Sequence, residues 1–340
     1  MRDIYELFNE ADVDISLYED ECLSEIERKR IKKRMKRKLH LHNPRLQRGR
    51  YRLAAISLVA VICLGFATGL PVKALSGVPF FRMLMAEHMK SDEAVIQRYT
   101  TTVGQTVSDS GMDIRLDDVL VDEGQLLIAY TVHATDTPLE GIGFPWMSVY
   151  VNGTEIPRNG SGNKSRLDAA TISFVQAVDL PDHTFKGSLD IQIVISGIPF
   201  QNRDTVNGTW GFAMTTSTEK LMRETKKIAV HHQIALDNGQ IITVSKLVLS
   251  PVSTTLYYEI SGGNEWDMHF IMTDQNGKSI EQQSARSNMK SNFNRYPALT
   301  GQETELLLTP VIMPGAESED HVLKRQTLKE HSFTIQIPGP

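Results

Sequence analysis

The sequence predicts a mainly β protein that is attached to a membrane by a single helix near its N-terminus. Three observations lead to this prediction: an uncharged run of twenty residues, two oppositely charged blocks in front of it, and a long region in which polar and apolar residues alternate. A chain of 340 residues has room for two globular domains beside such a helix. Its two cysteines, Cys22 and Cys63, both precede residue 70, so we expect the later region to rest on apolar cores rather than on disulfides.

Charge falls into three blocks along the chain. Residues 1–27 carry ten acidic residues against one Arg, a net charge of -9, and residues 28–52 carry thirteen Lys or Arg and no acid, a net charge of +13. The remaining 22 basic and 31 acidic residues contribute -9, which gives the total of -5. Such asymmetry indicates contact with a membrane or with nucleic acid.

The uncharged run from Leu53 to Val72 predicts a transmembrane helix over residues 53–72. At a rise of ~1.5 Å per residue, a run of this length spans roughly 30 Å, the thickness of a hydrocarbon core. The alternatives are a buried core helix or a signal peptide cleaved near Ala74. The apolar part of a signal peptide is usually ~7–15 residues long behind a short basic leader, whereas 52 residues precede this run.

Basic residues set the predicted orientation of this helix. After the helix, the only Lys or Arg residues before Asp92 are Lys73, Arg82 and Lys90. By the positive-inside rule, the N-terminus lies in the cytoplasm and the C-terminus outside the cell, which predicts a single-pass protein of the cell membrane. The arginines that crowd the N-terminal flank and carry this prediction are Arg45, Arg48, Arg50 and Arg52.

Residues 1–52 are predicted to form short helices that fold on a cytoplasmic partner. Three apolar residues among the first ten share one helix face, and the capping box Ser24-x-x-Glu27 begins a second helix. Short helices with such narrow apolar faces bury too little surface to fold alone. The alternative is a disordered tail whose basic run sets topology and contacts anionic lipid; DNA contact is disfavoured beside a membrane. The partner contact is assigned to Ile4, Leu7, Phe8, Leu17, Leu23 and Ile26.

Residues 73–100 are predicted to link the membrane helix to the β region. Apolar residues within Val78–Tyr99 recur at helical spacing, which favours a short amphipathic helix. Two placements are open for this helix, on the first β domain or on the outer leaflet of the membrane. We expect it to pack on the β domain.

From about residue 100 onward, period-two alternation predicts strands. Asn-Gly pairs at 152, 159, 207, 238 and 276 favour type I′ hairpin turns. Several of these asparagines also fit the N-x-S/T glycosylation pattern, but turn formation is sufficient to account for them. The predicted strands include Ile114, Leu116 and the ranges 126–132, 147–151, 171–178, 189–195, 228–234, 241–249, 256–260, 268–272, 306–312 and 333–337.

An internal repeat divides this β region. With an offset of 128 residues, several apolar positions align, among them Tyr130 with Tyr258. The repeat predicts two tandem immunoglobulin-like sandwiches, at residues 101–200 and 209–338. We expect about residues 100–340 to fold alone as a soluble β protein, because the strands carry their own core.

Motifs of catalysis are absent from the sequence. It lacks G-x-S-x-G, a glycine-rich phosphate loop and H-E-x-x-H. His231 and His232 are adjacent on a predicted strand, where they would face opposite sides and could not hold one metal together. The acid pairs at 117–118 and 122–123 are predicted to be solvated charges. We therefore expect no enzyme activity, no cofactor and no metal.

Several stretches together resemble a known family. They are the opening residues 3–10, the basic helix 23–39, the apolar run, the residues 78–81 and the stretch 122–130. In this order they resemble membrane-anchored, anti-sigma-factor-like proteins of Gram-positive bacteria, whose exported part begins with a domain of unknown function. Many relatives carry a second immunoglobulin-like domain, here about 209–338. The His/Cys zinc motif of a separate anti-sigma class is absent.

The resemblance implies signal transduction and transcription regulation. The cytoplasmic segment would sequester an extracytoplasmic-function sigma factor, the exported domains would sense an envelope signal, and the anchor would couple the two. Membrane lipid and an envelope protein or polymer are the further partners, and direct nucleic-acid binding is not expected. The alternative is a surface-anchored module whose sandwiches bind a wall polymer or a protein while the cytoplasmic tail is inert.

Overall fold

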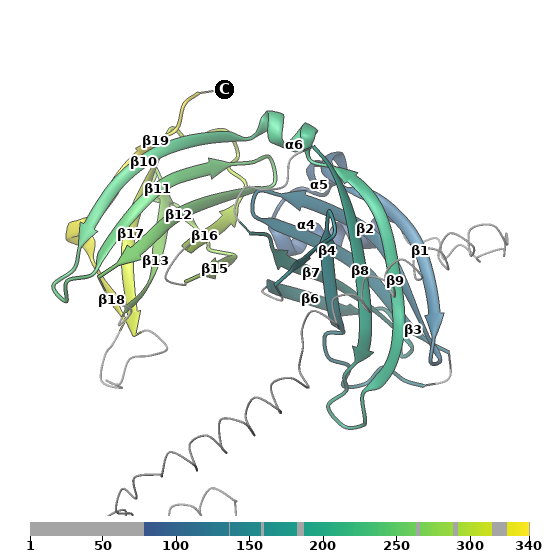
Figure 1. The fold of residues 1–340 in the computed structure, drawn as a ribbon. Helices are drawn as coiled ribbons and strands as arrows, with labels where there is room; N and C mark the ends of the chain where they lie inside the picture. The colour runs from purple at the N-terminus through teal and green to yellow at the C-terminus, as the bar shows by residue number, and fades with distance from the viewer. Residues whose placement is uncertain are drawn as a thin grey trace, which may run out of the picture. The chain divides into compact units, whose positions relative to one another are not determined.

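The computed structural model describes residues 78–135, 137–157, 160–181, 187–262, 266–287, 292–314 and 325–339. They belong to one compact unit, Leu70–Pro340. Antiparallel sheets with a few short helices make up this unit, which confirms the prediction of a mainly β protein (Figure 1). Within these ranges no helix has the length and apolar character needed to span a membrane. The predicted transmembrane segment 53–72 lies outside the described residues.

Two sheets enclose one core in the first half of the unit, and we call this pair the first sandwich. The five-stranded sheet has the order β1-β2-β3-β7-β6, and the four-stranded sheet has the order β5-β4-β8-β9. Both sheets contribute to the core, for example through Ile114, Val149 and Trp210. The strands are β1 (Thr101–Asp109), β2 (Met112–Asp122), β3 (Gln125–Ala134), β4 (Trp146–Val151), β5 (Thr154–Ile156), β6 (Gly160–Arg166), β7 (Thr171–Asp179), β8 (Ser188–Ile198) and β9 (Val206–Ser217).

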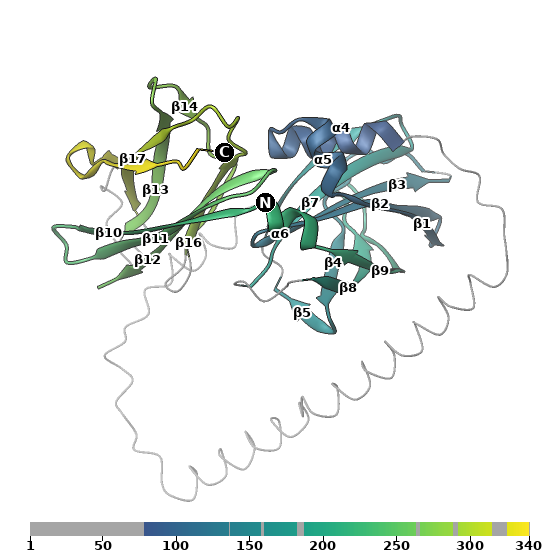
Figure 2. The same ribbon diagram turned by 90° about the horizontal axis from the view of Figure 1, so that it is seen from above.

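Helices α4 (Val78–Met89) and α5 (Glu93–Tyr99) cover the outer face of the five-stranded sheet. Figure 2 shows the order of the layers: helices, five-stranded sheet, four-stranded sheet. The expected packing of this segment on the β region is therefore confirmed. Because the sheet is apolar on both faces, a fragment that begins at residue 100 would expose one of them. The buried side chains of this layer are Leu84, Met85, Ala86, Met89 and Ile96 on the helices and Leu120, Leu127, Ala129, Val175 and Ala177 on the sheet.

The second half repeats this arrangement, and we call it the second sandwich. Helix α6 (Glu219–Glu224) leads into it. One sheet has the order β10-β11-β12-β16-β15; in the other, β14-β13-β17-β18, strand β19 also pairs with β17. Tyr258, Phe270 and Leu308 lie in its core. The elements are β10 (Lys226–Ala235), β11 (Ile241–Leu249), β12 (Ser253–Ser261), β13 (Trp266–Asp274), β14 (Ser279–Ile280), β15 (Ser284–Arg286), β16 (Asn292–Pro297), β17 (Glu305–Pro314), β18 (Gln326–Thr327), η2 (Lys329–His331) and β19 (Phe333–Gln336).

Irregularities of the strands repeat together with the strand order. The pairing of β2 with β3 shifts register between Leu116 and Asp118, and that of β11 with β12 shifts between Val244 and Lys246. These positions differ by 128 residues, the offset found in the sequence. A bulge places one extra residue in a strand and turns its neighbours. The two sandwiches therefore share a local deformation as well as an order of strands.

The predicted turns have mixed outcomes. Asn152 and Gly153 have φ values of 50° and 77° between β4 and β5, as a type I′ turn requires. Asn207 lies inside β9, so the turn predicted there was wrong. Ser110 and Gly111, with φ values of 51° and 72°, form a hairpin turn between β1 and β2 that the Asn-Gly pattern does not reveal.

Candidate functional site

The residues for which a site was predicted lie outside the described part of the chain. This holds for the partner-contact residues Ile4, Leu7, Phe8, Leu17, Leu23 and Ile26 and for the topology residues Arg45, Arg48, Arg50 and Arg52. Within the described ranges, two other features have the character of a site. One is a buried polar contact between the two sandwiches, which we call the joint, and the other is an aromatic groove in the first sandwich.

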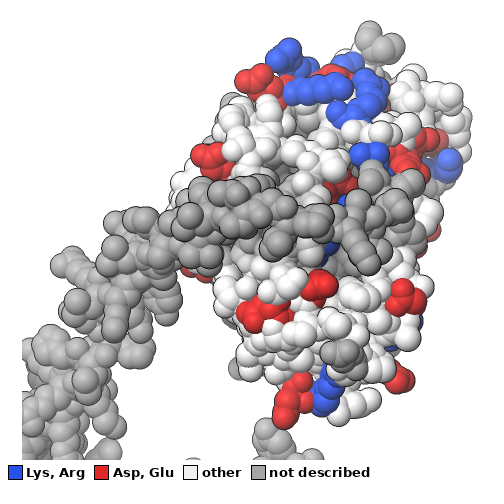
Figure 3. Space-filling model, turned by 90° about the vertical axis from the view of Figure 1, so that its right-hand side faces the viewer, with Lys and Arg blue, Asp and Glu red and all other residues white. Residues whose placement is uncertain are grey.

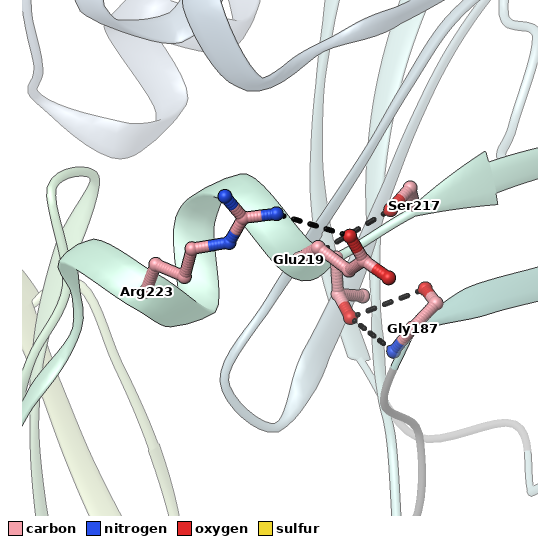
Figure 4. Close-up of polar contacts among 5 residues, drawn as sticks. Gly187, Ser217, Glu219 and Arg223 are labelled. Carbon is pink, nitrogen blue, oxygen red and sulfur yellow. Dashed lines mark hydrogen bonds and ion pairs between the residues drawn. The ribbon is translucent and has the colours of Figure 1, made fainter.

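The start of α6 is fixed to the first sandwich by hydrogen bonds. Thr218 is buried, its N–H donates to the Gly187 carbonyl at 3.0 Å, and its Oγ1 accepts from the Gly187 N–H at 3.0 Å. The Glu219 N–H donates to Ser217 Oγ at 3.3 Å, and Arg223 pairs with Glu219 at 3.2 Å (Figure 4). Gly187 directly precedes β8 and Thr218 directly follows β9, so their hydrogen bonds fix the direction in which α6 leaves the first sandwich.

Helix α6 also packs on α5 and on the second sandwich. Leu221 is buried in the apolar cluster of α4 and α5, and Val252 from the turn before β12 enters the same cluster. Tyr99 donates a hydrogen bond to the Glu224 carboxylate, and the Lys220 ammonium lies 5.4 Å from the centre of the Tyr99 ring. Helix α6 is thus held in place by apolar and polar contacts and is not a flexible linker.

The turn between β2 and β3 brings a buried acid into the joint. Asp122 is 2% exposed, and Ser253 at the start of β12 donates a hydrogen bond to its carboxylate. Burial raises the pKa of Asp122, and the bond from Ser253 opposes this shift. Gly124 turns the chain at a φ of 72°, and a Cβ at this position would lie 2.8 Å from the Tyr257 hydroxyl. A glycine suits this turn because φ is positive and because a larger residue would require the Tyr257 side chain of the second sandwich to shift.

Cations from the second sandwich face the acids of the first. Glu123 is buried and pairs with Lys227 of β10 at 2.9 Å. Arg295 of β16 donates to the Glu123 carbonyl at 3.4 Å and lies 3.9 Å from the Asp179 carboxylate of β7. Burial raises the pKa of Asp179, while the charge of Arg295 lowers it. Removing one partner from such a desolvated network costs about 3–5 kcal/mol, because the other charge stays buried.

The end of α4 reaches the second sandwich as well. Gln283 donates a hydrogen bond to the Met89 carbonyl, and Lys90 pairs with Glu281. From the first sandwich, Gln125 donates to Met89 Sδ at 3.4 Å. Residues of α4 therefore contact both sandwiches.

The prediction that the acid pairs are solvated was wrong. Asp117, Asp118, Asp122 and Glu123 are between 1% and 5% exposed. The reason is that β2 is an inner strand whose outer face is covered by α4 and α5, and its terminal turn is covered by the second sandwich. The alternation of residues in β2 does not show that helices cover its outer face. The composition of the acidic turn is likewise the same whether the turn is solvated or buried.

The acids at 117 and 118 bond to neighbours in the sheet, and Asp118 is linked to α4 through Thr102. Asp117, the extra residue of the β2 bulge, pairs with Arg115 at 2.9 Å and accepts from Thr131 at 2.9 Å. Asp118 accepts from Thr102 at 2.8 Å, and Arg82 of α4 donates to the same hydroxyl at 3.2 Å. Burial raises the pKa of Asp117 to about 7, against the opposing effects of Thr131 and Arg115.

The groove in the first sandwich has a volume of about 390 Å³ and lies between β4 and β6. Phe144 and Trp146 on its rim are 37% and 46% exposed. Each ring lies on a glycine: a Cβ at Gly162 would be 2.7 Å from Phe144, and one at Gly197 would be 2.8 Å from Trp146. The glycines leave room for the rings, which pack closely against the backbone there.

The described residues offer no group of three or more His, Cys, Asp or Glu side chains that could hold a metal. His232 stacks on Phe333 with ring centres 4.0 Å apart, and His231 adopts a φ of 52° beside it. In Figure 3, Lys and Arg side chains gather at the upper end of the visible face, with acidic side chains among and below them. The described part of this face is mixed in charge and lacks the basic stripe typical of nucleic-acid binding.

Comparison with known families identifies two domains in this chain. Residues 46–134 match a family described as "Domain of unknown function (DUF4179)", and residues 225–337 match a "Family of unknown function (DUF5643)". The first match extends from the arginine-rich flank of the apolar run to the end of β3. No curated protein is significantly similar to the chain.

Solved structures support the fold. The conserved domain protein from Bacillus anthracis aligns with a TM-score of 0.57 and 18% identity, over 71% of this chain and 92% of that chain. At this identity the likeness concerns the fold alone. The tandem Ig repeats of Dlar align over 67% of this chain and 98% of that chain at 8% identity, but their TM-score of 0.17 is too low to support an argument.

Sequence reasoning missed the residues of the joint for identifiable reasons. Asp122 carries a weak signal, since an acid directly after a run of buried residues at a glycine turn is a candidate for burial. Ser253 and Arg295 carry none, because Arg295 lies in a polar stretch that does not alternate. Their role depends on contacts with strands more than 100 residues away.

Proposed function

We propose that this protein is a membrane-anchored regulator of an extracytoplasmic-function sigma factor, anti-sigma-like in its mode of action. Residues 1–52 bind the sigma factor in the cytoplasm, residues 53–72 cross the membrane once, and the β region outside the cell senses an envelope signal. The charge blocks, the apolar run and the resemblance to anti-sigma-factor-like proteins support this proposal.

The observation that carries the proposal is the docking of α4 and α5. These helices follow the apolar run after a few residues and bury five side chains on the first sandwich. Met89 and the adjacent Lys90 bond to the second sandwich. A force or displacement that acts on either sandwich is therefore transmitted to the segment that leads into the membrane. Packed side chains and rigid secondary-structure elements can carry coupling of this kind between distant sites.

The strand orders support immunoglobulin-like sandwiches as the sensing domains. In an immunoglobulin domain, strands A, B, E and D form one sheet and C, F and G the other. The orders β2-β3-β7-β6 and β5-β4-β8-β9 correspond to this arrangement with one added C′ strand, and β1 extends the first sheet at its edge. The orders β11-β12-β16-β15 and β14-β13-β17 repeat it. Such domains present edges and loops for recognition.

The test is capture of the partner by the cytoplasmic segment. Residues 1–52 are used as bait in an extract of the source cells, and we expect a sigma factor to be retained. The double substitution Leu7→Asp and Phe8→Asp should abolish retention, because it buries charge in the predicted apolar face. The matched control Glu6→Gln with Glu10→Gln changes two charges of the same segment and should retain the partner. Retention that is equal for both double variants would overturn the proposal.

The aromatic groove favours a second candidate, a surface module that binds a wall polymer. Fixed, half-exposed rings such as Trp146 and Phe144 are typical of surfaces on which sugar rings or apolar groups stack. In this case the full-length protein should bind purified wall material, and Trp146→Ala should weaken that binding while residues 1–52 capture no partner. A sigma factor gene directly upstream would favour the regulator.

A further inference from the structure

A second cavity, of about 540 Å³, lies at the joint and is lined by both sandwiches. Edge strand β6 and its neighbour β7 form one wall, and edge strand β15 with β16 forms the other. This volume is within the range of small-ligand sites, about 300–1,000 Å³. The lining includes hydroxyl, charged and aromatic side chains that bear on ligand binding, namely Ser161, Asp179, Ser284, Arg286, Phe293 and Arg295.

Arg295 is a buried cation with weak compensation. It is 2% exposed, yet its contacts are long: 3.9 Å to the Asp179 carboxylate, 3.4 Å to Ser284 Oγ and 3.4 Å to the Glu123 carbonyl. Charge-assisted bonds are usually about 2.7–2.9 Å long. Its Nε has no hydrogen-bond partner among the described residues. A guanidinium carries five donors, so Arg295 retains capacity for a bidentate anion.

A second guanidinium meets the first at one aromatic ring. The Arg295 and Arg286 guanidinium carbons lie 4.5 Å and 4.9 Å from the centre of the Phe293 ring. The two cations are therefore within about 10 Å of each other, where like charges repel in a partly desolvated site. Phe293 fixes both side chains in place, and fixed arginine forks are suited to carboxylate and phosphate.

Asp179 is the one acid among the described residues that line the cavity. The described lining thus contributes two guanidinium groups and one carboxylate to the cavity. Ser161 and Ser284 add hydroxyl donors to the walls, and the small residues Gly160 and Ala177 leave the space open.

We propose that this cavity binds the anionic group, carboxylate or phosphate, of an envelope ligand, with Arg295 and Arg286 as the recognising residues. Because the walls belong to both sandwiches, an anion that accepts from Ser161 of β6 and from the two arginines links β6 to β15 and β16 and stabilises the joint. This assignment deepens the proposed sensing function and rests on it for its biological meaning. The binding itself is a property of the β region and does not depend on what residues 1–52 contact.

The experiment uses the purified full-length protein in detergent at constant ionic strength. Inorganic phosphate and succinate are titrated separately, and thermal unfolding is followed by tryptophan fluorescence, because a ligand that binds only the folded state raises the unfolding midpoint in a saturable way. We expect saturable stabilisation by at least one probe. The probe with the lower apparent Kd identifies phosphate or carboxylate as the preferred group.

Three variants decide whether this stabilisation arises in the cavity. Arg286→Gln should raise the apparent Kd about tenfold or more, since one charge-assisted contact is lost. Asp179→Asn should lower it, because the competing carboxylate is removed. Arg325→Gln, an exposed arginine bonded to His269 in the other sheet, is the matched control and should leave it within about twofold.

The outcomes separate binding from general damage. A folding defect would weaken binding in both cavity variants, whereas the proposal requires opposite changes from Arg286→Gln and Asp179→Asn. The proposal is overturned if neither probe gives saturable stabilisation, if Arg286→Gln keeps its affinity, or if Arg325→Gln loses as much. Failure here leaves the capture of a sigma factor by residues 1–52 unaffected, so the two proposals can fail independently.

Discussion

Met85 provides a direct test of the docking of α4 on the first sandwich. Its side chain is 0% exposed and lies in the cluster between α4, α5 and the outer face of the five-stranded sheet. Two residues earlier on the same helix, Met83 is 49% exposed. Met85→Ala removes a buried side chain from this layer, and Met83→Ala makes the same chemical change at the surface.

The expected magnitudes differ clearly. Truncation of a fully buried Met to Ala costs about 2–5 kcal/mol, from lost transfer free energy and from the cavity that remains. A surface truncation away from special features changes stability by about 0.5 kcal/mol or less. The first figure is a large share of the ~5–15 kcal/mol that stabilises a typical domain. For a chain of this size, it corresponds to a fall in Tm of roughly 3–7 °C.

The assay is urea unfolding of a fragment of residues 74–340. The fluorescence of Trp210, which is fully buried in the first sandwich, and far-ultraviolet circular dichroism are both followed. We expect a lower midpoint for Met85→Ala and an unchanged midpoint for Met83→Ala. Equal effects of the two substitutions, or a loss below about 0.5 kcal/mol for Met85→Ala, would refute the docking of α4 as a stabilising contact and with it the coupling argument.

Two further predictions concern a buried acid and the membrane topology. Burial raises the pKa of Asp117 from its ordinary value of 3.8 to about 7, so the folded state binds this proton more tightly than the unfolded state does. Wild-type stability should therefore fall as pH rises from about 4 to about 7, by about 4 kcal/mol at most from this group. Asp117→Asn should remove that slope. The free energy of unfolding of both proteins is measured with urea at several pH values, and the same pH dependence in both would contradict the prediction. For the topology, Asn276→Cys in an exposed turn, with Cys22→Ser and Cys63→Ser, should label with an impermeant thiol reagent in intact cells. Ser24→Cys on the same background should label only after permeabilisation, and reversed reactivities would exclude an N-terminus in the cytoplasm.

Alternating apolar residues were enough to locate most of the inner strands. The range 241–249 coincides with β11, and the ranges 147–151 and 189–195 lie within β4 and β8. These strands have one face toward a core and the other toward solvent or a polar layer, so their sequence carries the period of two. Strands β1, β6, β9 and β16 were not predicted, because glycine or polar residues interrupt that period.

The candidate site was much less accessible to sequence reasoning than the strands. Asp122 and Glu123 have the composition of a solvated turn, and their burial depends on Ser253, Lys227 and Arg295 of the other sandwich. Contacts over such separations leave no periodic pattern. The two-layer burial of the first sheet was visible only in part, as the continuous apolar run of β3, which signals cover on both faces.

By itself, the sequence determined the mainly β class, the repeat of 128 residues and the turn at Asn152 and Gly153, because each depends on local backbone preference or on short-range alternation. The prediction of a membrane anchor rests on the same kind of local information. Tertiary structure decided the packing of α4 and α5, the burial of four acids and the meeting of Arg286 and Arg295 at Phe293. These features arise where surfaces of distant segments exclude water together, and the free energy of a charge depends on that shared environment rather than on its neighbours in the chain.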